Sequence, residues 1–100
     1  MNRRSDLWKR TERAIAARLG GQRTGNRGVA APDVTTPWAA VEVKERRRLP
    51  QWIVRAVAQA RAGAGPNRLP LVILHEAGAK HDGDIVCLSL ADFEAWYGKP

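Results

Sequence analysis

Cysteine is almost absent from this chain, which contains only Cys87. One thiol cannot form a disulfide within the chain, and scarce cysteine is typical of proteins in a reducing compartment. Long apolar runs are missing as well, because no segment approaches the roughly 20 apolar residues that a membrane helix requires. No apolar run follows the two arginines near the N-terminus, so we expect no signal peptide. These absences predict an intracellular protein without a membrane partner.

Motifs for nucleotides and for histidine-bound metals are also missing. The sequence has no glycine-rich phosphate loop, so we expect no nucleotide cofactor. Its two histidines, His75 and His81, are not at metal-ligand spacing with each other or with Cys87. We expect His75, at the end of an apolar strand, to be structural, and His81 to be a loop residue. The "DGD" after His81 resembles part of a calcium loop but lacks the remaining ligand positions.

Acidic residues are few, and the resulting positive charge is uneven. The chain has 17 Lys and Arg against 10 Asp and Glu, and 13 of the basic residues are arginine. Residues 1–68 hold 15 basic and 5 acidic residues, whereas residues 69–100 hold 2 and 5. Arginine is suited to bidentate contact with phosphate. The bias predicts a nucleic-acid-binding surface, and the alternatives are solubility or an anionic membrane surface.

The order of predicted elements indicates an α/β fold. A chain of 100 residues fits one domain, residues 1–100, with one modest core. Hydrophobic spacing predicts helices over about 5–19 and 50–62 and strands over about 33–35, 38–45, 69–76 and 84–90. A last helix is predicted to start at Ser89 or Asp92 and to end near Tyr97. The order α-β-β-α-β-β-α predicts a small mixed sheet flanked by helices. The strand at 69–76 is nearly all apolar, so we expect it to be central and covered on both faces.

One carboxylate lies on the apolar face of the first predicted helix. Trp8, Ile15 and Leu19 form a stripe at helical spacing, and Glu12 falls on the same stripe. A carboxylate on an apolar face is costly unless it is paired or bound to a metal. We therefore expect Glu12 to have a partner. The helix is predicted to begin at Ser5 or Asp6 and to end before two glycines at about Leu19.

A candidate metal site lies in "PDVTTPWAAVEVKE". Asp33 begins one predicted strand, and a turn at "TTP" leads to a second strand that carries Glu42 and Lys44 on one face. Two carboxylates and the backbone carbonyl of Val43 can hold Mg²⁺, which polarises a phosphate and activates water. Lys44 can orient that water and offset charge on the reacting phosphate. Glu12 can join the site or hold a metal-bound water.

The simpler interpretation of the same stretch is structural. Glu42 and Lys44 are spaced for a salt bridge on a solvated strand face, and that pair alone is a weak signal. The preceding "PD", the carboxylate on the first helix and the basic surroundings favour the metal site.

These motifs resemble those of a known protein family. The "PDV…VEVK" pattern is similar to the PD-(D/E)xK nuclease signature, and the α-β-β-α-β-β order resembles the restriction-endonuclease-like core of that superfamily. The most similar members are small archaeal-type and phage-type Holliday-junction resolvases, over roughly residues 8–90. The resemblance implies metal ligation by Asp33 and Glu42, a catalytic Lys44 and a supporting metal role for Glu12. It also implies that Gln59, on the second helix, flanks the site.

The resemblance further implies a Mg²⁺-dependent endonuclease, with Mn²⁺ as a substitute, in a prokaryotic or phage-infected cell. Such enzymes are homodimers in which each subunit nicks one strand of a four-way DNA junction and leaves a 5′-phosphate. Their serine-bearing loop is "RTGNRG" here, with Thr24 and Asn26 as candidate replacements. The alternatives are another small nuclease that cuts flaps, duplexes or single strands, and a non-catalytic DNA-binding protein. The predicted DNA contacts are Arg23, Thr24, Asn26, Arg27, Arg46, Arg47, Arg48 and Arg55.

Overall fold

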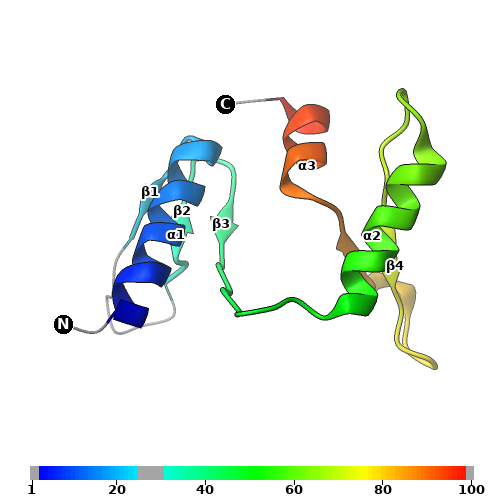
Figure 1. Ribbon diagram of the computed structural model, residues 1–100, viewed down its shortest axis with the longest axis horizontal. Helices are drawn as coiled ribbons and strands as arrows, with labels where there is room; N and C mark the ends of the chain where they lie inside the picture. The colour runs from blue at the N-terminus through cyan, green and yellow to red at the C-terminus, as the bar shows by residue number, and fades with distance from the viewer. Residues whose placement is uncertain (1–2, 25–30, 99–100) are drawn as a thin grey trace. The chain divides into compact units, whose positions relative to one another are not determined.

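Two compact units make up the described part of the chain. The computed structural model describes residues 3–24 and 31–98. The described residues up to Arg47 form the first unit, and Arg48–Gly98 form the second (Figure 1). The prediction of one domain over residues 1–100 stays a prediction. Within these ranges no helix combines the length and the apolar character that a membrane span needs.

The first unit packs one helix against a three-stranded antiparallel sheet (Figure 1). Its elements are α1 (Arg3–Leu19), β1 (Gln22–Arg23), β2 (Val34–Thr35) and β3 (Ala40–Val41). The strand order is β1-β2-β3, and α1 contacts β1 and β2. Ala16 and Leu19 of α1 and Val34 of β2 are the buried apolar side chains of this unit. The core is therefore small and depends on close backbone packing.

Two glycines end α1 and bring the chain back to the sheet. Gly20 has φ +70°, and the Gly21 N–H donates to the Ala16 carbonyl at 2.8 Å. This is the Schellman arrangement, in which a glycine with positive φ satisfies a late helix carbonyl. The predicted helix end at Leu19 is confirmed, but α1 begins at Arg3, before the predicted start.

The turn between β2 and β3 is built around a buried threonine. The Thr36 N–H donates to the Ala39 carbonyl at 3.0 Å. The Thr36 Oγ1 accepts from the Trp38 and Ala39 N–H groups at 3.1 Å and 2.8 Å. A threonine side chain that bonds to nearby backbone in this way stabilises a turn. The turn predicted at "TTP" is confirmed, and it aligns β2 with β3.

The second unit contains two helices and a hairpin. Its elements are α2 (Gln51–Ala64), β4 (Val72–Leu74), the short helix η1 (His81–Gly83), β5 (Ile85–Cys87) and α3 (Leu90–Tyr97). β4 pairs with β5 in antiparallel fashion, and α2 contacts β4. The Arg68 guanidinium donates to the carbonyls of Ala64 at 2.9 Å and Gly63 at 2.7 Å. A cation at this end satisfies orphan carbonyls and favours the helix dipole.

The α/β fold class is confirmed, but the strands pair differently from the prediction. The described strands form two antiparallel sheets instead of one mixed sheet. Short connections inside each hairpin permit antiparallel pairing, whereas parallel strands need a longer crossover. The prediction that the strand at 69–76 is covered on both faces is also wrong for these residues. β4 pairs only with β5 among the described strands, and Ile73 is 53% exposed.

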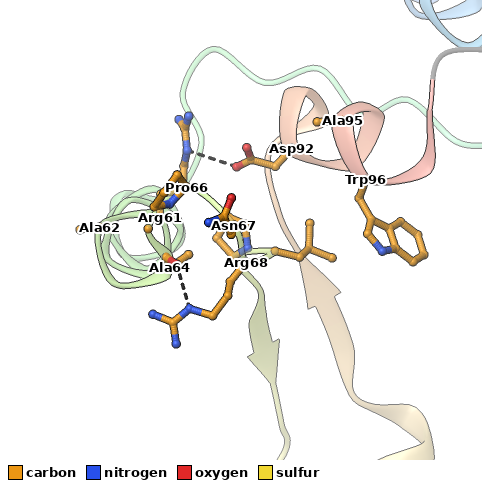
Figure 2. Close-up of a pocket in the computed structure, with 12 residues that line it drawn as sticks. Arg61, Ala62, Ala64, Pro66, Asn67, Arg68, Asp92, Ala95 and Trp96 are labelled. Carbon is orange, nitrogen blue, oxygen red and sulfur yellow. Dashed lines mark hydrogen bonds and ion pairs between the residues drawn. The ribbon is translucent and has the colours of Figure 1, made fainter.

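An open hollow of about 580 Å³ lies between the C-terminal end of α2 and α3. Figure 2 shows Arg61 reaching from α2 to Asp92 on α3, where Nε and Oδ2 are 3.1 Å apart. The Ser89 Oγ accepts from the Asp92 N–H at 3.1 Å and so caps α3, which starts at the first of the two predicted positions. The pair links α2 to α3 beside the hollow, with the Arg61 side chain 58% exposed.

The close approach of Gly21 to β2 generates a prediction. A Cβ at residue 21 would lie 2.7 Å from Thr36 Cγ2 and would overlap the Thr35 carbonyl oxygen. We therefore expect Gly21→Ala to lower the free energy of unfolding by roughly 1–3 kcal/mol, as overpacking does. Urea denaturation followed by circular dichroism measures this change.

Gly63→Ala is the matched control for that substitution. A Cβ at residue 63 has nothing within 4 Å, and the residue lies inside α2. Alanine there should stabilise the helix by roughly 0.5–1 kcal/mol. Equal effects of the two substitutions would contradict the close approach.

Candidate active site

The β2–β3 hairpin brings Asp33 and Glu42 to opposite positions. The register pairs Val34 with Val41 and Thr35 with Ala40. Continued by one residue, the same register places Asp33 across from Glu42. Directly opposite residues of an antiparallel pair have Cβ atoms roughly 4.5–5.5 Å apart. Asp33 and Glu42 therefore each lie next to the last paired residues of the hairpin, Val34 and Val41.

Hydrogen bonds to its neighbours orient Asp33. Its Oδ2 accepts from the Val43 N–H at 2.8 Å. Its backbone carbonyl accepts from the Thr24 N–H at 3.1 Å, and the Thr24 hydroxyl donates to the Pro32 carbonyl. A carboxylate has several lone pairs, so Oδ1 retains the capacity to bind a cation. The Asp33 side chain thus holds the Val43 backbone through Oδ2, and its Oδ1 can bind a cation.

Glu42 and Lys44 lie on the exposed face of the chain after β3. Exposure alternates along this segment: Glu42 and Lys44 are exposed, whereas Val41 and Val43 are half-buried, as the predicted alternation requires. The Lys44 Nζ and Glu42 Oε2 are 4.0 Å apart. An exposed ion pair at this distance contributes little to stability. Both side chains therefore remain available to a metal or a phosphate at small energetic cost.

Glu12 is buried and paired with an arginine. Its side chain is 7% exposed, and its Oε1 lies 2.6 Å from the Arg23 Nε. The Arg23 guanidinium also lies over the Trp8 ring, 5.5 Å from the ring centre. The predicted partner of Glu12 is thus a cation of β1. The pairing compensates the cost of burial and turns Arg23 inward, away from the solvent-facing role predicted for it.

A pocket of about 910 Å³ gathers most of the predicted site residues of the first unit. The predicted residues in its wall are Glu12, Asp33, Val43, Lys44, Arg46 and Arg47. Leu7, Trp8 and Glu45 complete the described lining. Glu42 is not among the residues that line this pocket, and its placed contact is with Lys44. The pocket therefore combines oxygen donors with cations, which a phosphate-processing site requires.

Glu45 is a pocket residue that the sequence analysis missed. The Thr11 hydroxyl of α1 donates a hydrogen bond to its Oε1. Strand alternation puts Glu45 on the face opposite Glu42 and Lys44, which is why it was not selected. The pairing of β3 ends at Val41, so the chain beyond it is not held to strand alternation. Only the contact with α1 places this carboxylate.

The remaining predicted residues are not gathered at this pocket. Asn26 and Arg27 lie outside the described residues. Arg48, Arg55 and Gln59 belong to the second unit, where their side chains are exposed. Their roles stay predictions.

Comparisons with known proteins assign no family to the chain. A scan against family models and searches of curated proteins and of solved structures found no match. The chemistry of this pocket is therefore inferred from its own residues.

The buried pair of Glu12 and Arg23 generates a prediction about stability. Methionine keeps most of the arginine volume and removes the cation. We expect Arg23→Met to lower the free energy of unfolding by roughly 3 kcal/mol, because Glu12 is left buried without an opposite charge. Urea denaturation followed by circular dichroism is the measurement.

Two further variants make the test of this pair specific. Arg13→Met removes an exposed arginine next to Glu12 in α1, and its effect should stay within about 0.5 kcal/mol. The double variant Glu12→Met/Arg23→Met should recover most of the lost stability, since no buried charge remains. A double variant as unstable as Arg23→Met would show that the two side chains are not coupled.

Proposed function

We propose that this chain is a Mg²⁺-dependent endonuclease of the PD-(D/E)xK type that nicks four-way DNA junctions. One observation carries the proposal: Asp33, Val43 and Lys44 line one pocket, and the β2–β3 register puts Glu42 across from Asp33. In this proposal, the two carboxylates and the ammonium group act together on one phosphate. The order α1, β2, β3, α2, β4, β5 is that of a restriction-endonuclease-like core with β1 as an addition, but the described strands pair in two separate sheets.

The residues present fit a magnesium ion. Asp33 and Glu42 offer carboxylate oxygens from neighbouring strands, and the Val43 carbonyl is a third hard donor, the type that Mg²⁺ prefers. The hydrogen bond from Val43 N–H to Asp33 Oδ2 holds two of these donors in register. When bound, the ion would polarise the scissile phosphate and lower the pKa of a water ligand.

Lys44 and Glu12 have separate roles in this proposal. Lys44 is exposed and only loosely paired with Glu42, so its ammonium group can hold the attacking water and offset charge on the phosphate. Glu12 already accepts from Arg23, so it acts as a positioning residue that fixes the pocket wall. Water attacks the phosphorus, the bond to the 3′ oxygen breaks, and the product strands carry a 5′-phosphate and a 3′-hydroxyl.

DNA binding in this proposal rests on exposed arginines beside the pocket. Arg46 and Arg47 are exposed and line it. Residues 1–68 also carry most of the positive charge of the chain. Guanidinium groups at this rim can bind backbone phosphates on either side of the cut. A homodimer would present two such sites to a junction that itself has near two-fold symmetry.

A non-catalytic DNA-binding protein is the second candidate, and the ion pairs favour it. Glu12 is neutralised by Arg23, and Glu42 lies 4.0 Å from Lys44. In that case the carboxylates stabilise the unit and the exposed arginines bind DNA without cleavage. The two candidates differ in whether the phosphodiester bond breaks.

Cleavage assays separate these candidates. We expect the full chain to nick a mobile four-way junction in Mg²⁺ or Mn²⁺ and to be inactive in EDTA. Asp33→Asn, Glu42→Gln and Lys44→Met should each lower the cleavage rate by at least about 100-fold, because each removes a group that acts on the reacting phosphate. Junction binding, measured by gel shift, should persist.

Matched variants and substrates control this experiment. Glu76→Gln and Lys80→Met make the same charge changes at exposed positions of the second unit and should leave cleavage unchanged. Equal cutting of a junction, a flap and a linear duplex would refute junction selectivity and indicate another small nuclease. A wild-type chain that binds the junction but cuts nothing with either metal would establish the non-catalytic candidate.

The exposed arginines at the pocket, Arg46 and Arg47, generate a separate prediction about the salt dependence of DNA binding. If Arg46 and Arg47 each bind one phosphate, Arg46→Ala/Arg47→Ala should weaken binding to all sequences alike. The slope of log Kobs against log salt should become shallower by roughly 0.9 for each duplex phosphate that is no longer neutralised. Lys80→Ala, in the acidic C-terminal third, should leave the slope unchanged. An unchanged slope in the double variant would exclude phosphate binding by these two arginines.

A further inference from the structure

The β4–β5 hairpin brings a histidine and an aspartate together at its connected end. The register pairs Leu74 with Ile85, so the next residues, His75 and Asp84, stand across from each other. The His75 Nδ1 lies 2.6 Å from the Asp84 Oδ1. The Asp84 side chain is 13% exposed, so most of its surface is enclosed. Cross-strand geometry therefore holds this contact in place.

The connection between the strands folds a second histidine onto the same carboxylate. His81 begins η1, and the Asp84 N–H donates to its carbonyl at 2.9 Å. The His81 Nδ1 lies 2.9 Å from the Asp84 Oδ2. The two imidazole rings are stacked, with centres 4.3 Å apart and planes inclined by 28°. One carboxylate thus contacts two stacked imidazoles, each through the same ring nitrogen.

We propose that His75, His81 and Asp84 form a binding site for a divalent transition-metal ion of the zinc class. One donor atom from each residue lies within 4.8 Å of the others. A tetrahedral zinc ion with bonds of roughly 2.0–2.1 Å holds its ligand atoms about 3.3 Å apart. The present contacts of 2.6 Å and 2.9 Å are somewhat shorter than this spacing, and the stacked rings have to turn so that both Nδ1 atoms point at one ion.

The donor set selects the class of metal. Two imidazole nitrogens and one carboxylate oxygen suit zinc, nickel, copper and cobalt, whereas Mg²⁺ and Ca²⁺ prefer oxygen ligands alone. Three protein ligands leave a position for water, and the exposed ring of His81, at 82%, keeps that side open to solvent. The bound ion would also close the segment 75–84 and fasten the hairpin.

Sequence spacing did not reveal this cluster. His75 and His81 were expected to be structural and loop residues, because their separation along the chain is not a metal-ligand spacing. The hairpin register and the turn at η1, not the local spacing, bring them to Asp84. The "DGD" segment contributes Asp84 alone, and Asp82 is exposed within η1.

Calorimetric titration of the full 100-residue chain with zinc chloride tests the proposal. The titration is made in excess magnesium chloride, which occupies the proposed site at Asp33 and Glu42, and we expect one zinc ion to bind per chain. His81→Asn and Asp84→Asn should each raise Kd by at least about tenfold, because each removes a ligand. Asp82→Asn, which makes the same charge change in the same turn, and Cys87→Ser, which removes the one thiol, should leave Kd unchanged. Magnesium chloride should not compete for the site.

Nitrogen NMR of the histidine rings identifies which ring nitrogens bind the ion, in addition to the affinity from calorimetry. The chain has two histidines, so both imidazole signals can be followed. Zinc should shift the Nδ1 resonance of both rings in the wild type and of neither in Asp84→Asn. Circular dichroism checks that each variant keeps its fold. Zinc binding that survives both His81→Asn and Asp84→Asn, or no binding to the folded wild type, would overturn the proposal. Neither result bears on nuclease activity.

Discussion

The buried ion pair between Glu12 and Arg23 is the interaction on which the first unit depends. The apolar core of this unit is small, with Ala16, Leu19 and Val34 as its buried apolar side chains. A carboxylate at the edge of such a core is tolerated only with an opposite charge, and β1 supplies it at 2.6 Å. The pair fastens α1 to the two-residue strand β1, which also pairs with β2. It also fixes one wall of the candidate pocket.

In this unit, a side chain that stabilises the structure also belongs to the proposed active site. Asp33 holds the Val43 N–H and is at the same time the first proposed metal ligand. Lys44, in contrast, makes only a loose and exposed contact with Glu42. This division is physically reasonable, because a metal-ligating carboxylate must be held in position, whereas a lysine that follows a reacting phosphate needs freedom to move. The basic segment that follows, with Arg46 and Arg47, stays exposed beside the pocket.

Much of the local structure could be predicted from the sequence. The features that were not predicted have a common cause. The end of α1 at two glycines, the Thr36 turn and the exposure pattern around Glu42 depend on neighbouring residues, and all three were predicted. The two-residue strand β1, the division into two antiparallel sheets and the exposure of Ile73 were not. These features depend on which distant segments pair, and hydrophobic spacing carries no information about pairing partners. Glu45 was missed for the same reason, because only its contact with α1 places it at the pocket.

By itself, the sequence determined which chemical groups are available and how they are spaced along the chain. The alternation of Glu42 and Lys44, and the turn that sets Asp33 across from Glu42, follow from the period of a strand and the length of a hairpin. Tertiary structure decided which charges meet. Arg23 turned inward to Glu12 although its position predicted a DNA contact, and Asp84 joined two histidines that looked unrelated. The physical reason is that a charge pairs with whatever opposite or polar group the fold brings within about 3 Å, whatever the distance along the chain.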